Sequence, residues 1–236
     1  MITTFEQIFD ELRAKPKKRL VAAWAVDDHT INAARLAVEA GIVEATLVGD
    51  EKMIKQVCAH ENIDPAIFRI VPIEDELKAV SIAVDLINQG EGDILMKGLC
   101  STDKYMRAIL NKERGLLPPK AVLSHVTVLS NPRYHKLLVI GDIAVIPAPD
   151  LNQKIAITNY VAKTARAIGI QKPKVALIAA TEQMLPGMQA CVDAAIISKM
   201  ADRGQVTGCI VDGPLALDVA LSQEAVAVKK LVSNVA

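Results

Sequence analysis

The sequence has few aromatic residues, no paired cysteines and no long apolar run. Aromatic residues make up 3% of the 236 positions although 51% are hydrophobic, so the core must be aliphatic, which favours layered helices and strands over an aromatic-rich β-sandwich. Neither the four scattered cysteines nor the four histidines show metal-ligand spacing. We therefore predict free thiols in a reducing, cytoplasmic setting and no metal. The cysteines are Cys58, Cys100, Cys191 and Cys209.

Charge of either sign is not in excess, since 27 lysines and arginines balance 27 aspartates and glutamates. No net field then attracts nucleic acid or an anionic membrane. No apolar run approaches the ~18 to 20 residues of a membrane helix, and the N-terminus does not resemble a signal peptide. The densest basic run, at residues 15–19, reads as a solvated link between a helix and a strand. We predict small-molecule partners, with neither nucleic acid nor membrane among them.

What is present is an alternation of helical and strand patterns. Phe5, Ile8, Phe9 and Leu12 form one stripe of an amphipathic helix. Short apolar runs then alternate with helical segments, the first of which we expect to be capped by Thr30 and stopped after residue 40 by a glycine. This order is typical of a parallel sheet covered on both faces. Strands are predicted at residues 19–26, 45–48, 68–72 and 93–96, with helices at 30–40, 51–59 and 74–88.

The alternation breaks between Pro118 and Pro149. Two longer apolar runs, at residues 121–130 and 136–140, are joined by a turn-forming stretch and predict an antiparallel extension of the sheet. After residue 150 the alternation resumes, with predicted elements at 152–168 (helix), 175–179 (strand), 188–203 (helix), 206–211 (strand) and 215–230 (helical). The prolines at 147 and 149 predict a domain boundary there, dividing the chain into α/β domains 1–147 and 148–236.

Ligands of open parallel sheets gather at the carboxyl ends of strands, and one such segment follows the strand at 93–96. Lys97 and Gly98 lead into a helix that Ser101 or Thr102 can cap, so its free amides could hold a phosphate, with added charge from Lys97 and Arg107. Taken alone the signal is weak, because a strand-to-helix turn with a capping serine occurs in every α/β protein.

Two further segments are candidates. Asp212, Gly213 and Pro214 follow a predicted strand, where ordinary turn chemistry with proline near the first helical position explains them equally well. Ser124 precedes His125 in an apolar strand, and a lone histidine there is more often a hydrogen-bonded core residue than a base. Neither a Gly-x-Gly-x-x-Gly fingerprint nor a P-loop is present. Spacing alone therefore indicates a phosphate-handling α/β protein and nothing more specific.

At these same segments the sequence resembles the phosphate acetyl/butyryltransferase family over nearly its whole length. The similarity is strong because several motifs occur in order and at family spacing, and the last two are most like the phosphate butyryltransferases. The motifs are Asp93-Ile-Leu-Met-Lys-Gly, Ser101-Thr102 with Arg107, Ser124-His125-Val126, Ala144-Val-Ile-Pro-Ala-Pro-Asp150, Ser198-Lys-Met-Ala-Asp-Arg-Gly204 and Val211-Asp-Gly-Pro-Leu-Ala-Leu-Asp218.

The resemblance implies an enzyme of short-chain fatty acid metabolism that exchanges a butyryl or other short or branched acyl group between coenzyme A and phosphate, by direct attack in a ternary complex. It implies two α/β domains around a cleft, as in the isocitrate/isopropylmalate dehydrogenases, in a homodimer or larger homo-oligomer. Coenzyme A is then a substrate, and no cofactor is bound. The implied binding residues are Arg107 for coenzyme A phosphate, Lys97, Gly98, Ser101 and Thr102 in the loop beneath it, Ser124, and Asp212, Gly213 and Pro214 across the cleft.

One departure from the family pattern limits what the resemblance implies. Family members continue beyond Ala236 with a segment that carries a Ser-Arg pair and an aspartate, so the catalytic residues are unassigned here, and we expect the chain to be impaired. Alternatives left open are a coenzyme A or anion-binding module without turnover, a dehydrogenase of the related fold, and an α/β domain without a site. Met184, Leu185 and Met188 could line an acyl pocket or simply pack.

Overall fold

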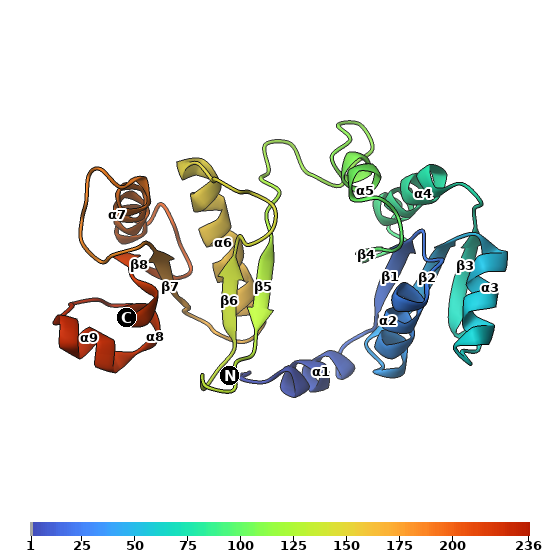
Figure 1. Ribbon diagram of the computed structural model, residues 1–236, viewed down its shortest axis with the longest axis horizontal. Helices are drawn as coiled ribbons and strands as arrows, with labels where there is room; N and C mark the ends of the chain where they lie inside the picture. The colour runs from blue at the N-terminus through green and yellow to red at the C-terminus, as the bar shows by residue number, and fades with distance from the viewer. Residues whose placement is uncertain (1) are drawn as a thin grey trace. The chain divides into compact units, whose positions relative to one another are not determined.

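The computed structural model describes residues 2–236, which fall into two compact units (Figure 1). The N-terminal unit comprises Glu6–Ala121, and the C-terminal unit comprises Val122–Ala236 together with residues 2–5. The boundary predicted at 147/148 falls inside the C-terminal unit, between the strand that ends at Gly141 and the helix that begins at Leu151, and stays a prediction. No helix among residues 2–236 is long and apolar enough to cross a membrane.

The N-terminal unit is built on a parallel sheet in the order β3-β2-β1-β4. Successive residues of β1 point to opposite faces: Leu20 and Ala22 lie in one core cluster, Val21 and Ala23 in the other. Both faces are therefore buried, as the continuous apolar runs predict. The strands are β1 (Lys18–Ala23), β2 (Val43–Gly49), β3 (Phe68–Pro72) and β4 (Ile94–Lys97), and the other elements are α1 (Phe5–Arg13), α2 (Asp28–Glu39), α3 (Glu51–His60), the 3₁₀ turn η1 (Pro65–Ile67), α4 (Glu76–Asn88) and α5 (Thr102–Ile109).

Aspartates cap the helices that follow the first three strands. The expectation that Thr30 caps α2 is wrong, because the helix begins two residues earlier and the Asp27 carboxylate accepts the Thr30 amide at 3.0 Å. Asp50 and Asp75 cap α3 and α4 in the same way. The predicted stop of α2 is confirmed at Gly41, whose φ of +77° suits glycine.

The C-terminal unit contains two separate two-stranded sheets. Strands β5 (Val126–Leu129) and β6 (Leu138–Gly141) pair antiparallel, and β7 (Lys174–Ile178) pairs parallel with β8 (Ile210–Leu215). The antiparallel pairing is confirmed, but it forms a sheet of its own instead of extending another. The helices are α6 (Leu151–Ala167), α7 (Gln189–Asp202), α8 (Leu217–Leu221) and α9 (Gln223–Lys229). An aliphatic core that includes Ala162, Val175, Ile197 and Val211 joins α6 and α7 to the parallel pair.

Candidate functional site

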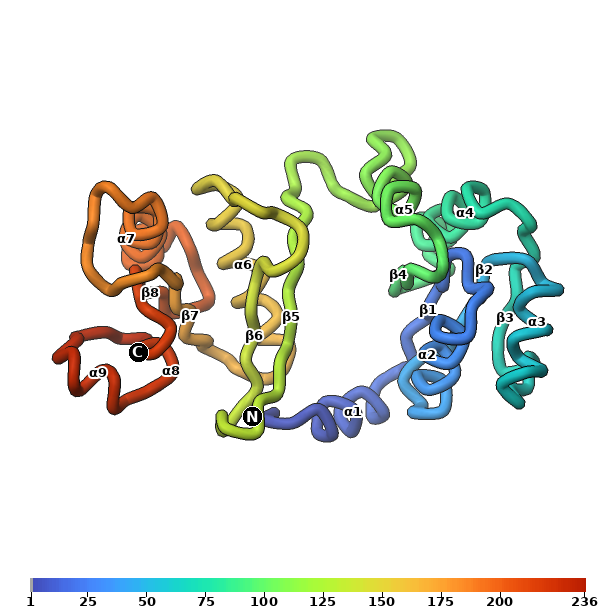
Figure 2. Tube along the Cα trace, viewed as in Figure 1, coloured from blue at the N-terminus to red at the C-terminus, as the bar shows by residue number. Residues whose placement is uncertain are grey.

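The first candidate segment follows β4, the edge strand of the N-terminal unit's sheet that pairs with β1. From β1 the chain moves outward to β2 and β3, then returns to place β4 on the other side of β1, so the carboxyl ends of β1 and β4 flank a topological switch point. Ligands of doubly wound sheets bind at such a point. Figure 2 follows the chain from β4 into α5, through the segment that contains the predicted loop residues.

Gly98 is fixed here by a close approach of two backbones. Its amide donates to the Ala23 carbonyl at 2.9 Å, and the next amide, of Leu99, donates to the Trp24 carbonyl at 3.0 Å. A Cβ atom at position 98 would lie 2.4 Å from the Trp24 oxygen and 2.7 Å from the Ala23 oxygen. Only glycine therefore lets the loop lie against the end of β1.

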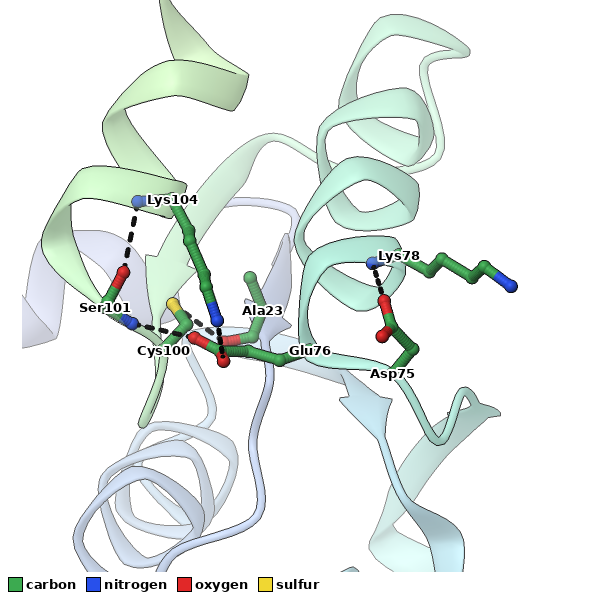
Figure 3. Close-up of polar contacts among 7 residues, drawn as sticks. All are labelled: Ala23, Asp75, Glu76, Lys78, Cys100, Ser101 and Lys104. Atoms are coloured by element: carbon green, nitrogen blue, oxygen red, sulfur yellow. Dashed lines mark hydrogen bonds and ion pairs between the residues drawn. The ribbon is translucent and has the colours of Figure 1, made fainter.

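Ser101 caps α5 through its side chain, as predicted, and its backbone is held from another helix (Figure 3). The Ser101 amide donates to the Glu76 carboxylate at 2.9 Å, and the Lys104 ammonium pairs with the other oxygen of the same carboxylate. Hydrogen bonds from Lys104 and then from the Ser101 amide lower the pKa of Glu76. Sequence reasoning missed Glu76, since it reads as an ordinary first-turn acid of α4.

The three cations of this segment differ in their partners. Arg107 is 79% exposed and pairs with Asp103 one turn earlier on α5, with 2.9 Å between Nε and a carboxylate oxygen. Lys104 pairs with Glu76. Lys97 makes no ion pair among residues 2–236, and its Nζ lies 3.4 Å from the Gly98 carbonyl. Lys97 is therefore the cation of the loop that forms no ion pair within residues 2–236, although its charge also helps to lower the pKa of Glu76.

Ser124 belongs to a second cluster, which centres on Asp142 in the C-terminal unit. The Ser124 hydroxyl and the His125 amide donate to one carboxylate oxygen at 3.0 and 3.1 Å, while the Ala144 and Val145 amides donate to the other at 2.8 and 2.9 Å. Burial by itself raises the pKa of Asp142, but these hydrogen bonds outweigh it and hold the pKa well below its usual value. Sequence reasoning missed Asp142.

The prediction that His125 lies within a strand is wrong, because β5 begins at Val126 and His125 directly precedes it. Its Nδ1 lies 3.1 Å from the Thr127 hydroxyl. This agrees with the interpretation of a hydrogen-bonded, part-buried histidine rather than a catalytic base.

Asp212, Gly213 and Pro214 lie within β8, so their interpretation as a turn after the strand is wrong. The strand continues to Leu215, because the pairing of β8 with β7 shifts register between Ala176 and Ile178 and so accommodates the glycine and proline. The helix begins only at Leu217. A Cβ atom at position 213 would lie 2.7 Å from the Leu177 carbonyl oxygen, so glycine again permits a close backbone approach.

The Asp212 carboxylate accepts the Gly213 amide at 2.8 Å and the Ser233 hydroxyl. It lines a surface pocket of about 350 Å³ in the C-terminal unit, together with Lys172, Ser198 and Asn234. Within residues 2–236 no group of three histidine, cysteine, aspartate or glutamate side chains is placed to hold a metal ion. The pocket offers hydroxyl, amide, ammonium and carboxylate groups to a polar ligand.

Comparison with known proteins identifies the family. The family model described as phosphate acetyl/butaryl transferase matches residues 3–80 and 74–236. The chain belongs to this family. Phosphate butyryltransferase of Clostridium acetobutylicum is 43% identical over 236 residues, which cover all of this chain and 78% of that protein. Phosphate acetyltransferase of Thermotoga maritima is 37% identical over 98% of this chain and 78% of that protein.

A solved structure agrees with the sequence comparison. The branched-chain phosphotransacylase from Enterococcus faecalis V583 superposes with a TM-score of 0.78 and 27% identity, covering 92% of this chain and 75% of that one. The relatives are thus acyltransferases, and nothing in these comparisons supports the dehydrogenase or the inactive binding module as the better interpretation.

Proposed function

We propose that the chain exchanges an acyl group between coenzyme A and inorganic phosphate, with butyryl or another short or branched chain as the acyl group. The observation that carries this proposal is the 43% identity to a phosphate butyryltransferase along the whole chain, within a family match that spans both units. The reaction is acyl-CoA plus phosphate giving acyl phosphate plus free coenzyme A.

In the forward direction a phosphate oxygen attacks the thioester carbonyl, a tetrahedral oxyanion forms, and the carbon–sulfur bond breaks. The attacking phosphate gives up its proton, and the sulfur leaves as thiolate and takes up one proton, so the acyl group ends on phosphate and no net proton is gained or lost. The protein must hold two polyanionic substrates and stabilise the developing oxyanion. We assign the catalytic base to none of the residues 2–236.

Each unit contributes to substrate binding in this proposal. In the N-terminal unit the β4–α5 loop would contact the phosphates of coenzyme A, supported by the unpaired charge of Lys97 and by the exposed Arg107, which would have to leave Asp103. In the C-terminal unit the pocket at Asp212 and the Ser124 cluster would receive the remaining groups. The proposed set is Lys97, Gly98, Ser101, Thr102, Arg107, Ser124, Asp212, Gly213 and Pro214.

The family also supports a proposal for the architecture. Two α/β domains, residues 1–147 and 148–236, would surround a cleft as in the isocitrate/isopropylmalate dehydrogenases. The protein would act as a homodimer or larger homo-oligomer in the cytoplasm, in short-chain fatty acid metabolism, with coenzyme A as a substrate and no bound cofactor.

The test is thiol release from butyryl-CoA by the purified chain, with and without phosphate, and with acetyl-CoA as the comparison substrate. We expect release that requires phosphate and is faster with butyryl-CoA. Release that ignores phosphate would indicate a thioesterase instead. Equal rates with both thioesters would refute the acyl preference and leave acyl transfer itself standing. The two acyl groups differ by two methylenes, each typically worth ~1 to 3 kcal/mol of discrimination.

A further inference from the structure

Glu76 links α4 to the start of α5, at the β4–α5 loop that the proposed function assigns to substrate binding. Glu76 is the first residue of α4, whose own N-terminus is capped by Asp75 through the Lys78 amide at 2.8 Å. Its carboxylate is thus free to point away from α4, toward Ser101 and Lys104 (Figure 3). The two contacts use both oxygens of one carboxylate, and they bind the N-cap of α5 and a residue three positions later in its first turn.

The same contact separates the roles of two lysines. Lys104 is 37% exposed and its ammonium is neutralised by Glu76, which is 25% exposed. Lys97, on the other side of Gly98, forms no ion pair within residues 2–236, and the Glu76 carboxylate feels its charge only as the smallest of the contributions that lower the Glu76 pKa. The loop between them is held at its start by the backbone contact of Gly98 with β1 and at its end by Glu76.

We infer that Glu76 is a positioning residue: it holds the loop 97–104 in its substrate-binding conformation and keeps Lys104 out of the anion site, so that Lys97 meets the substrate phosphate. We call the pair of contacts from Glu76 to Ser101 and Lys104 the clamp. The inference rests on the proposed function for the identity of the substrate, but not for the clamp itself. The role that we infer for Glu76 is exerted through Ser101 and Lys104, the two residues that its carboxylate contacts on the α5 side.

The variants are Glu76→Ala, which removes both contacts, and Glu76→Gln, which keeps an acceptor for the Ser101 amide and loses the ion pair. The matched control is Asp85→Asn, which removes one negative charge from the same helix where Asp85 pairs with Arg114. Nine residues of helix separate the two acids by about 13 Å, beyond the Debye length of about 10 Å at 0.1 M salt.

The first readout is hydrogen exchange of the backbone amides of residues 99–104, which does not depend on turnover. We expect faster exchange in E76A, an intermediate rate in E76Q, and no change in D85N. Unchanged exchange in E76A would overturn the clamp even if the chain is an active acyltransferase. Faster exchange in a chain without any transfer activity would leave the clamp standing and refute the proposed function.

The second readout is steady-state kinetics with butyryl-CoA and phosphate. We expect E76Q to raise KM for butyryl-CoA about three- to tenfold with little change in kcat, because a charged hydrogen bond that is partly exposed is lost. Lys104→Met should do the same, and the double variant should be no worse than either single one. A lower KM in E76Q would show that Glu76 competes with the substrate anion. If K104M raised KM as much in the E76Q background as it does alone, Lys104 itself would bind the anion. Either result would overturn the inference.

Discussion

Replacing Gly98 by alanine tests the close backbone approach on which the candidate loop depends. The added Cβ would lie 2.4 Å from the Trp24 carbonyl oxygen, and contacts under 3.0 Å are essentially never seen for real Cβ atoms, so the backbones must separate by at least 0.6 Å. Both neighbours are backbone atoms, which cannot rotate away as a flexible side chain would. Two hydrogen bonds, from the amides of residues 98 and 99, lie across the same contact. Forced overpacking of this kind costs about 1 to 3 kcal/mol.

Urea unfolding followed by the fluorescence of Trp24, the single tryptophan, measures this cost beside the loop itself. The matched control is Gly187→Ala, because no atom lies within 4 Å of a Cβ there and its φ is not in the left-handed region. We expect G98A to lower the free energy of unfolding by about 1 to 3 kcal/mol and G187A to leave it within about 0.5 kcal/mol. Equal stability of G98A and wild type would refute the packing argument.

Three further predictions concern groups that the sequence did not single out. Asp142→Asn should destabilise the chain at pH 7, and the difference from wild type should disappear in acid. The folded state lowers the pKa of Asp142, so the ionised carboxylate stabilises the fold above the unfolded pKa of about 3.9, and this stabilisation is lost as the pH falls through the folded pKa. Acid-unfolding curves that run parallel for the variant and wild type would contradict the prediction. Lys154→Met removes the ion pair of Asp193, whose side chain is 5% exposed and lies 2.6 Å from the Lys154 ammonium. The free energy of unfolding in urea should fall by about 2 kcal/mol or more, because a buried carboxylate is left without its partner. A fall below about 0.5 kcal/mol, less than the roughly 1 kcal/mol of a typical hydrogen bond, would contradict this. Burial raises the pKa of Tyr105 to about 12. The stability that its neutral phenol contributes should be fully present below pH ~10 and should be lost as the pH rises toward 12. The free energy of unfolding should fall less over this pH range in Tyr105→Phe, which has no phenol to ionise.

The sequence predicted most of the N-terminal unit because its elements are local. Continuous apolar runs define β2 and β3 to within a few residues, and the alternation with helices is typical of a parallel sheet. The cap of α2 was misassigned for an equally local reason: Asp27 and Thr30 are both good caps, and the choice depends on where the chain leaves β1.

The interactions of the candidate sites could not be predicted, because they join residues distant in sequence. Glu76 reaches Ser101 across 25 positions and Ser124 reaches Asp142 across 18, and no periodicity records such pairs. The extension of β8 through Asp212 to Leu215 was missed because proline and glycine usually end strands, whereas here the register shift against β7 accommodates them. The sequence motifs therefore located the candidate residues, whereas only the structure shows which of their polar atoms already form hydrogen bonds or ion pairs within the protein.

Whether this chain moves an acyl group onto phosphate can be measured by following labelled inorganic phosphate into butyryl phosphate in the presence of butyryl-CoA. We expect one acyl phosphate for each thiol released, and a weaker reaction in Lys97→Met, which loses the ammonium that forms no ion pair within residues 2–236. Thiol release without labelled acyl phosphate, or no reaction of butyryl-CoA at any phosphate concentration, would contradict this expectation.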